Sequence, residues 1–183
     1  MKRTLSTRSA VAAIAILSLA AVRPARAQAT QAGAAKLDDP TIVAIFDAAN
    51  TWDIETGNIA VKKGSTKEVR DFGAMLVRDH TMVRQQGRDL VKKLGVTPTA
   101  PKDFAMAKDH ASAVKKLETL KGKAFDHAFL QNEVDFHKAV IDAVNTTLLP
   151  ALQNPEARDL VTKVAPAFQA HMMAAQHMLD QAK

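Results

Sequence analysis

The stretch "VKKGSTKE", Val61 to Glu68, joins two amphipathic segments through a turn of only a few residues. Gly64 suits the residue after a helix, and Ser65 with Glu68 three positions later has the spacing of a capping box that begins the next helix. Two consecutive helices joined by so short a turn lie side by side and antiparallel. The stretch therefore predicts a helical hairpin.

Long helical patterns extend on both sides of this turn. The first begins where Asp38 or Asp39 can cap it, has Pro40 at its first position, and ends at Lys63. The second continues to Gly95, with apolar residues recurring three and four positions apart. One apolar face of the first segment consists of Ile42, Ile45, Ala48, Ala49, Trp52 and Ile59.

Three more helical segments complete the chain. A shorter one runs from Lys102 to Leu120, and a long one runs from about Ala124 to Leu149 and stops at Pro150. The last begins at Asn154 as cap, with Pro155 behind it, and continues to the end. Because strand-like alternation is missing, we predict an all-α chain: a ferritin-like four-helix bundle with a long crossover that carries an extra short helix.

The chain opens with a pattern typical of a secretory signal peptide. Basic residues precede an apolar run from Ala10 to Val22, and small residues flank Arg26 at a cleavage motif. We therefore predict a signal peptide at 1–27, a flexible neck at 28–38 and a ferritin-like helical domain at 39–183. A retained N-terminal anchor is the alternative. No later segment is apolar enough for an integral membrane span, so we expect a periplasmic protein, with outer-membrane association left open.

Charge and cysteine content exclude several classes of function. The leader holds five basic residues and no acid, so cleavage lowers the Lys and Arg count from 25 to 20 against 19 Asp and Glu, and the net charge from +6 to +1. The mature chain therefore lacks the strongly basic balance of a nucleic-acid partner. The chain has no cysteine, which excludes thiol catalysis, thiolate metal sites and a lipid-anchoring cysteine.

Polar side chains interrupt the apolar stripes that should face the core. In "FLQNEVDFHKAV", 129–140, Glu133 and His137 are one turn apart on the same face as Leu130 and Ile141. His80 and His171 occupy similar positions in the second and fourth long helices. Imidazoles and a carboxylate in a water-poor core suit a transition metal such as zinc, copper or iron. They also suit a hydrogen-bonded polar core without metal.

Residue counts indicate which of these groups share a level in the bundle. If the crossover returns the chain to the end where the second helix finishes, His80, Glu133 and His171 are level, and His137 is one turn away. Glu55 falls about five residues too high. We therefore predict metal ligands at His80, Glu133, His137 and His171, with Glu55, Asp79 and Asp126 as outer-shell or weaker contributors.

A di-iron centre is not expected, because it requires Glu-x-x-His motifs. The residues three positions before His80, His137 and His171 are Val77, Val134 and Phe168. Serine-hydrolase, phosphate-loop and dinucleotide motifs are also missing. Catalysis is therefore not expected, although a redox activity stays an open alternative.

Other histidines suggest weaker sites. Met173 and His177, one turn apart, form a separate candidate that suits copper(I), with core packing as the alternative. Met106 and His110 repeat that spacing, and there we expect a partly buried structural histidine. His127, near a helix start, is expected to face solvent.

The stretches "FDAANTWDIETGNIA", "VRDFGAMLVRDHT", "KGKAFDHAFLQNEVDFHKAV" and "APAFQAHMMAAQHML" together resemble the bacterial family called domain of unknown function 4142. The resemblance runs from about Asp39 to the C-terminus. It implies an exported ferritin-like bundle, often labelled an outer membrane protein, with no established reaction. His127-Ala128-Phe129 departs from the family pattern, in which we expect a Tyr.

The resulting hypothesis is an exported helical bundle that binds a transition metal in its core through His and Glu and acts in envelope metal handling or stress tolerance. The alternative is a structural or interaction protein of the envelope with a hydrogen-bonded polar core and no metal. The sequence leaves the protein partner and the oligomeric state open.

Overall fold

The computed structural model describes residues 37–101 and 104–182, and within them every regular element is a helix. The predicted signal peptide, 1–27, and the neck up to residue 36 lie outside the described residues. The helices are α1 (Asp39–Lys63), α2 (Lys67–Leu94), α3 (Ala105–Thr119), α4 (Gly122–Ala143), the π-helix η1 (Val144–Leu148), α5 (Leu149–Ala151) and α6 (Pro155–Gln181).

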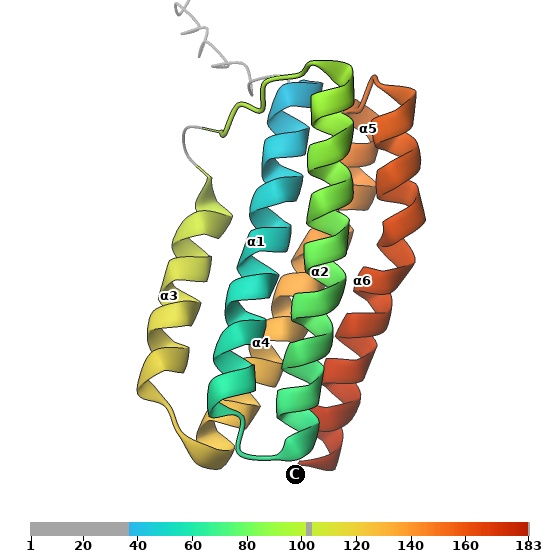
Figure 1. Ribbon diagram of the computed structural model, residues 1–183. Coiled ribbons are helices and arrows are strands. Elements are labelled where there is room, and N and C mark those ends of the chain that lie inside the picture. Colours follow the sequence, from blue (N-terminus) through green and yellow to red (C-terminus); the bar gives the residue numbers. More distant parts are fainter. Residues whose placement is uncertain (1–36, 102–103, 183) are drawn as a thin grey trace, which may run out of the picture. The chain divides into compact units, whose positions relative to one another are not determined.

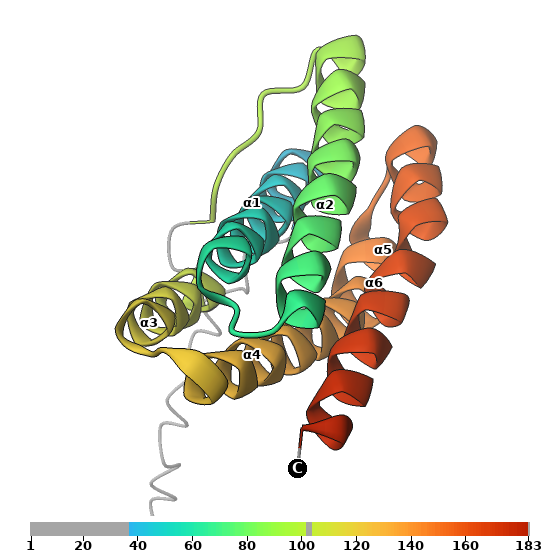
Figure 2. The same cartoon turned by 60° about the horizontal axis from the view of Figure 1, so that its bottom comes forward.

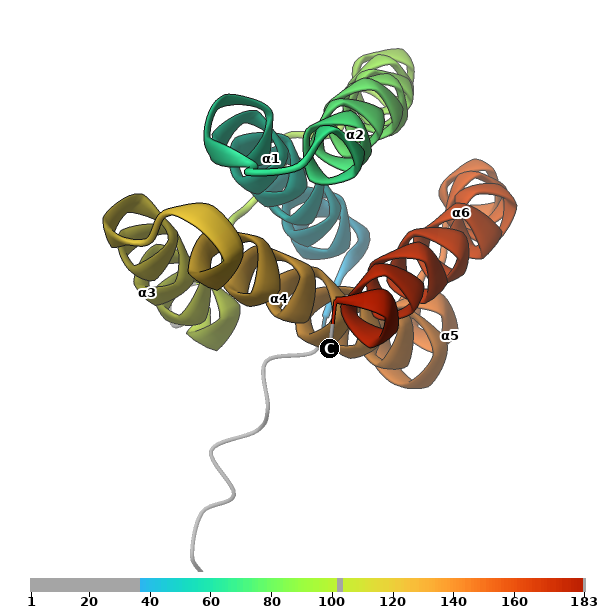
Figure 3. The same cartoon turned by 90° about the horizontal axis from the view of Figure 1, so that it is seen from below.

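The four long helices α1, α2, α4 and α6 form the predicted ferritin-like bundle. Figure 1 shows α1 and α2 as an antiparallel hairpin, with α4 and α6 as the second. Viewed from below, the four helices surround a common centre (Figure 3). None of the helices formed by the described residues is long and apolar enough to cross a bilayer.

The crossover runs in the direction opposite to the expected one. α3 descends along the outer side of α1 (Figures 1 and 2), so α4 begins beside the turn between α1 and α2. A hydrogen bond from the Ser65 backbone N–H to Asp126 Oδ1, 2.8 Å long, joins these two ends. Helix α3 has 15 residues and covers about 22 Å at about 1.5 Å per residue, roughly half the length of the 28-residue α2. The expectation that α4 starts at the far end is therefore wrong.

The cap of α2 also differs from the capping-box prediction. Thr66, not Ser65, accepts the hydrogen bond from the Val69 backbone N–H, at 3.2 Å. The Ser65 hydroxyl instead donates to Asp126 Oδ2. Ser65 therefore joins the α1–α2 turn to α4, while its neighbour caps the helix.

The other caps follow the predicted residues. Asp38 caps α1 by accepting from the Thr41 backbone N–H, and Asn154 caps α6. Asp39 has a different partner, because its carboxylate accepts from the backbone N–H groups of Gln153 and Asn154, each at 2.8 Å. This contact ties the start of α1 to the start of α6.

The end of α4 is more complex than the predicted stop at Pro150. α4 ends at Ala143 and continues as the five-residue π-helix η1, in which the Leu149 N–H donates to the Val144 carbonyl. Pro150 lies in the first turn of the short α5. Proline is tolerated there because its missing N–H has no helical partner to lose.

Helix α1 has two buried faces, and one of them contacts α3. The Trp52 ring stacks on His110 with 5.2 Å between the ring centroids, and it also contacts Phe104 and Phe136. Trp52 therefore faces the crossover rather than the bundle centre. The residues of α1 that are buried are Ile42, Phe46, Asn50, Asp53, Thr56, Gly57 and Ala60.

The core consists of two apolar clusters, one toward each end of the bundle. Val83, Val144 and Phe168 belong to the upper cluster. Leu76 and Phe129 belong to the lower one. One level of the bundle therefore lies between the two apolar clusters, and the candidate site occupies this layer.

Two glycines allow α1 and α2 to approach closely next to this layer. A Cβ atom on Gly57 would lie 2.8 Å from the Gly73 carbonyl oxygen. One on Gly73 would lie 2.8 Å from both the Ala60 Cβ and the Gly57 carbonyl oxygen. Real Cβ atoms do not approach backbone this closely, so any larger residue would push the two helices apart.

We expect Gly73→Ala to destabilise the fold. The forced separation of α1 and α2 should lower the free energy of unfolding by about 1–3 kcal/mol, despite the higher helix propensity of alanine, about 1 kcal/mol. Gly87→Ala on the same helix is the control, because its Cβ would make only ordinary contact with the Phe46 ring, at 3.4 Å. Urea unfolding measures both. A Gly73→Ala protein as stable as the Gly87→Ala protein would contradict the close approach.

Candidate metal centre

Buried polar side chains from all four long helices meet in the layer between the apolar clusters. None of them is more than 4% exposed. Burial of so many polar groups is unfavourable unless each has a partner. The set is Asn50, Asp53, Thr56, His80, Glu133, His137 and His171.

Three imidazole rings form the centre of this layer. One ring nitrogen from each of His80, His137 and His171 lies within 4.8 Å of the other two. His80 Nε2 and His171 Nδ1 are 3.2 Å apart. The rings come from α2, α4 and α6, so only the assembled bundle brings them together.

The His80 ring is oriented by α1. Asn50 Nδ2 donates to the Phe46 carbonyl at 2.8 Å, which turns the Asn50 Oδ1 toward His80 Nδ1, 3.0 Å away. An amide oxygen can only accept a hydrogen bond. His80 Nδ1 therefore carries the proton, and in the neutral ring Nε2 has a free lone pair.

The His171 ring is oriented by the residue that precedes His80. His171 Nε2 lies 3.1 Å from Asp79 Oδ2. Burial by itself raises the pKa of Asp79, but the hydrogen bonds from Arg78 and His171 bring that pKa below its ordinary value. The ionised carboxylate accepts from His171 Nε2, so the lone pair of the neutral ring is on Nδ1.

The His137 ring is oriented by its own helix. His137 Nδ1 donates to the Glu133 backbone carbonyl one turn earlier, at 2.9 Å. Its Nε2 has no hydrogen-bond partner among the described residues, although it is fully buried. In the neutral ring this nitrogen also has a free lone pair.

These orientations leave two facing ring nitrogens without a hydrogen-bond donor between them. His80 Nε2 and His171 Nδ1 face each other at hydrogen-bond distance, yet both are acceptors in the neutral rings. Two acceptors cannot bond each other without a cation or an added proton between them. His137 lies within 4.8 Å of both by one ring nitrogen, and its Nε2 is a further buried acceptor without a hydrogen-bond partner among the described residues.

Burial opposes the added proton. It lowers the pKa of His80 to about 2, and the neighbouring imidazoles His137 and His171 add to this effect. Burial, then the charge on His171, lowers the pKa of His137 to about 4. The pKa of His171 is also lowered, mainly by burial. The rings are therefore neutral near pH 7, which is the form that binds metal ions.

A carboxyl pair lies beside His137 and forms a second group of candidate ligands. One atom each from Asp53, Glu133 and His137 lies within 4.8 Å of the others. Asp53 Oδ1 and Glu133 Oε2 have no hydrogen-bond partner among the described residues. Burial raises the pKa of Glu133 to about 7, and burial with the charge on Glu133 raises that of Asp53 well above its ordinary value.

A void of about 10 Å³ lies beside His80, His137 and Asp53, and neither His171 nor Glu133 lines it. Asn50, Asp53, His80 and His137 line it on the polar side, and Phe46 and Phe168 are among the residues that close it. A space of this size holds about one water-sized sphere. The void beside His80 and His137 therefore has room for about one water-sized group.

The structure brings together the four residues predicted as ligands and Asp79. Glu133 lies eleven residues after the start of α4 and His80 thirteen after the start of α2. They are level because α4 and α2 begin at the same end of the bundle, although the predicted crossover direction was wrong. Asp79 contacts His171, with 3.1 Å between Asp79 Oδ2 and His171 Nε2.

Two of the predicted outer-shell residues lie elsewhere. The Glu55 carboxylate is half-exposed and accepts from His110 Nε2, at 2.8 Å. Asp126, about 10 Å along α4 from Glu133, binds Ser65 at the turn between α1 and α2. In both cases the position of the partner could not be predicted from the sequence. Glu55 contacts the crossover helix, and Asp126 contacts the hairpin turn.

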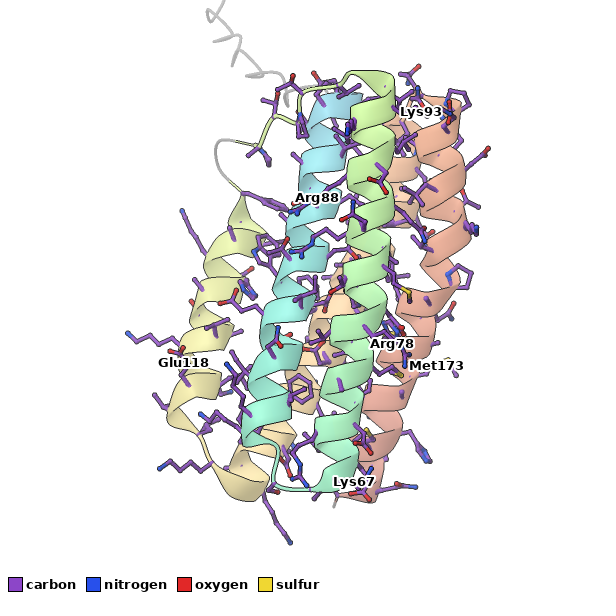
Figure 4. All side chains as sticks on the ribbon, in the orientation of Figure 1. Lys67, Arg78, Arg88, Lys93, Glu118 and Met173 are labelled. Atoms are coloured by element: carbon purple, nitrogen blue, oxygen red, sulfur yellow. The ribbon has the colours of Figure 1, made fainter. Side chains whose placement is uncertain are left out.

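The weaker histidine candidates do not assemble into a site. Met173 is 61% exposed, and His177 is exposed and contacts Gln181 (Figure 4 labels Met173 on the outer face). His127 is exposed, as predicted. The partly buried structural role predicted for His110 agrees with its stacking on Trp52.

Sequence reasoning missed Asn50, Asp53 and Thr56 on α1. They continue the spacing of three or four residues that begins at Ile42 and Phe46. That periodicity was the available signal. The predicted core face was centred on Trp52 instead, and Trp52 lies about 100° around the helix from Asp53.

Comparisons with known proteins agree with the fold but indicate no activity. A model of the family described as "Domain of unknown function (DUF4142)" matches residues 23–178. The structure titled "Crystal structure of DUF305 fragment from Deinococcus radiodurans" is similar with a TM-score of 0.69 and 15% identity, over 78% of this chain and 95% of that one. At this identity the likeness concerns the fold alone. None of the curated proteins compared with the chain matches it.

We expect Glu133→Gln to change the pH dependence of stability in the metal-free protein. Because the pKa of Glu133 is raised to about 7 from 4.5, the folded state keeps a proton that the unfolded state releases between these values. The wild type loses this contribution as pH rises, and the variant has none to lose. The stability of the variant relative to wild type should rise from about pH 4.5 to 7, by at most about 1.4 kcal/mol per pH unit.

Urea unfolding at several pH values measures this difference. Glu118→Gln is the control, because Glu118 is exposed at the surface of α3 (Figure 4) and its removal should give no such slope. A flat difference for Glu133→Gln would show that the buried carboxyl group does not hold its proton near neutral pH.

Proposed function

The chain belongs to the DUF4142 family, and because that description names no activity, we propose from the site itself that the protein binds one transition-metal ion in its core. The ligands in this proposal are His80, His137 and His171. The supporting observation is the 3.2 Å approach of His80 Nε2 and His171 Nδ1, two nitrogens held as acceptors by their other partners. A metal ion bound by all three lone pairs would remove this repulsion.

Partners outside the three rings support the proposal. Asn50 Oδ1, the Glu133 carbonyl and Asp79 Oδ2 each accept from one nitrogen of a ring, which leaves the other nitrogen of that ring with its lone pair. Metal-bound histidines are commonly held in this way, which fixes their tautomer and increases their affinity for the ion. The arrangement is therefore preorganised for a ligand before any ion enters.

Glu133 has a different role in this proposal from the one predicted. Its side chain groups with Asp53 and His137, not with all three imidazoles. We assign Asp53 and Glu133 as a carboxyl pair next to the ion, where their ionisation would balance its charge. Three neutral imidazoles with nearby carboxylates suit zinc, copper or iron.

Binding, rather than turnover, is the function that the site supports best. The three imidazoles are at most 4% exposed, so a substrate has no open approach to the ion. The predicted leader at 1–27 would export the protein, where a thiol-free site keeps its ligands under oxidising conditions. We therefore propose a role in metal handling or stress tolerance in the bacterial envelope, with periplasmic location as part of the proposal.

The metal-free alternative also has an observation in its favour. Asn50, His80, His171 and Asp79 form a continuous series of close contacts. One proton added between His80 and His171 would complete it as a hydrogen-bonded chain. This polar core would hold an imidazolium in the protein interior, against the lowered pKa values of both rings.

Metal content distinguishes the two functions. We expect the protein, purified without an affinity tag, to hold one equivalent of a transition metal by plasma mass spectrometry. Chelation should lower its melting temperature, because an ion that binds only the folded state stabilises it. No metal, and no rise in melting temperature with added zinc, copper or iron, would favour the polar core.

Histidine variants locate the ion. His137→Ala and His171→Ala should each abolish stoichiometric binding. His127→Ala and His177→Ala are matched controls on the same two helices, because both residues are exposed, and they should bind as wild type does. Far-UV circular dichroism confirms that each variant is folded. Wild-type affinity in a folded His137→Ala protein would reject the assigned ligands.

A further inference from the structure

A second candidate binding site lies at the upper end of the bundle in Figure 1. A cavity of about 390 Å³ is lined by residues of α1, α2 and α6, by the segment that follows α2, and by the segment that precedes α6. This volume falls in the range of small-molecule sites, roughly 300–1,000 Å³. The imidazole ligands of the proposed metal centre do not line it.

The lining of this cavity is almost entirely apolar. Ile42, Val43, Leu90, Val91, Pro98 and Leu160 are among the side chains that form its walls. Gly87 lines the cavity without a side chain, and an added Cβ there would lie 3.4 Å from the Phe46 ring. Such walls favour a hydrocarbon group over a polar ligand.

Three charged residues line the same cavity, and their pairing is unequal. The half-exposed Arg88 is bound by Asp47 through two hydrogen bonds, of 2.6 and 3.0 Å. Arg84, one turn earlier on α2, donates only to the Thr51 hydroxyl, at 3.3 Å. Among the described residues no carboxylate pairs with Arg84, so one positive charge at the apolar cavity lacks a counter-ion.

We propose that this cavity binds an amphiphile with a single hydrocarbon tail and a carboxylate head, with the tail among the apolar walls and the head on the Arg84 guanidinium. The apolar lining selects the tail, and the unpaired cation selects the sign of the head. A lipid-derived fatty acid has this chemistry.

The inner end of the cavity lies next to the polar layer. Phe46 lines the cavity and also the small void beside Asp53, His80 and His137. Phe46 therefore contacts both the cavity and the void. The amphiphile site uses none of the proposed metal ligands, and metal-free protein is expected to bind the amphiphile.

Calorimetric titration of chelator-treated protein tests the site with three probes that share one tail. We expect decanoate, below its micelle concentration, to bind one to one and about tenfold more tightly than decanol, because its charge meets Arg84. Decyltrimethylammonium should bind more weakly than decanol. Equal affinities for the three probes, or no saturable binding, would overturn the proposal without bearing on the metal centre.

Substitutions assign the roles of the charged residues. Arg84→Gln should reduce decanoate affinity to that of decanol and leave decanol unchanged. Asp47→Asn, which frees Arg88, should tighten decanoate severalfold. Lys67→Gln, on the same helix at the opposite end (Figure 4), is the charge-matched control and should change neither. Unchanged decanoate binding by Arg84→Gln would reject the head-group assignment.

A variant that occupies the cavity tests the tail. Gly87→Leu directs a side chain toward Phe46, and it should weaken decanoate and decanol together. The melting temperature shows whether this variant folds. A folded Gly87→Leu protein that binds both probes as wild type does would place the tail elsewhere and overturn the proposal.

Discussion

The contact between His80 Nε2 and His171 Nδ1 is the constraint on which the centre of this bundle depends. Each ring is held from behind by a fixed acceptor, Asn50 Oδ1 in one case and Asp79 Oδ2 in the other. Their remaining nitrogens therefore face each other, 3.2 Å apart, as two acceptors. An ordinary protein core would not keep such a pair, because lone pairs without a donor are unfavourable in a medium of low dielectric. The surrounding structure is understandable as the frame that holds this arrangement.

That frame extends through all four long helices. The apolar clusters above and below keep water out of the polar layer, which lowers the pKa of the histidines and raises that of Glu133. Gly57 and Gly73 bring α1 and α2 together, so Asn50 and Asp53 can reach the rings that α2, α4 and α6 supply. The upper end of the same bundle contains the apolar cavity, which Phe46 also lines.

Helices, fold class and four inward-facing residues could be predicted from the sequence, because helical periodicity alone determines which residues share a face. His80, Glu133, His137 and His171 interrupt clear apolar stripes. Asp53 could not be found in this way, since Trp52 packs on α3 and shifted the predicted face of α1. Glu55 was misplaced for the same reason. The crossover direction and the Ser65 contact with Asp126 depend on tertiary packing. The tautomers of His80 and His171 depend on partners from other helices. None of these features follows from a local sequence pattern.

The orientation of the ring protons is the central claim, and nitrogen-15 NMR of the imidazoles in metal-free protein at pH 7 measures it most directly. The structure predicts neutral rings, with the proton on Nδ1 in His80 and His137 and on Nε2 in His171. The exposed His127 and His177 serve as internal references. A doubly protonated His80 or His171, or a proton on His80 Nε2, would contradict the account, because the two rings would then be joined by an ordinary hydrogen bond with no place for an ion.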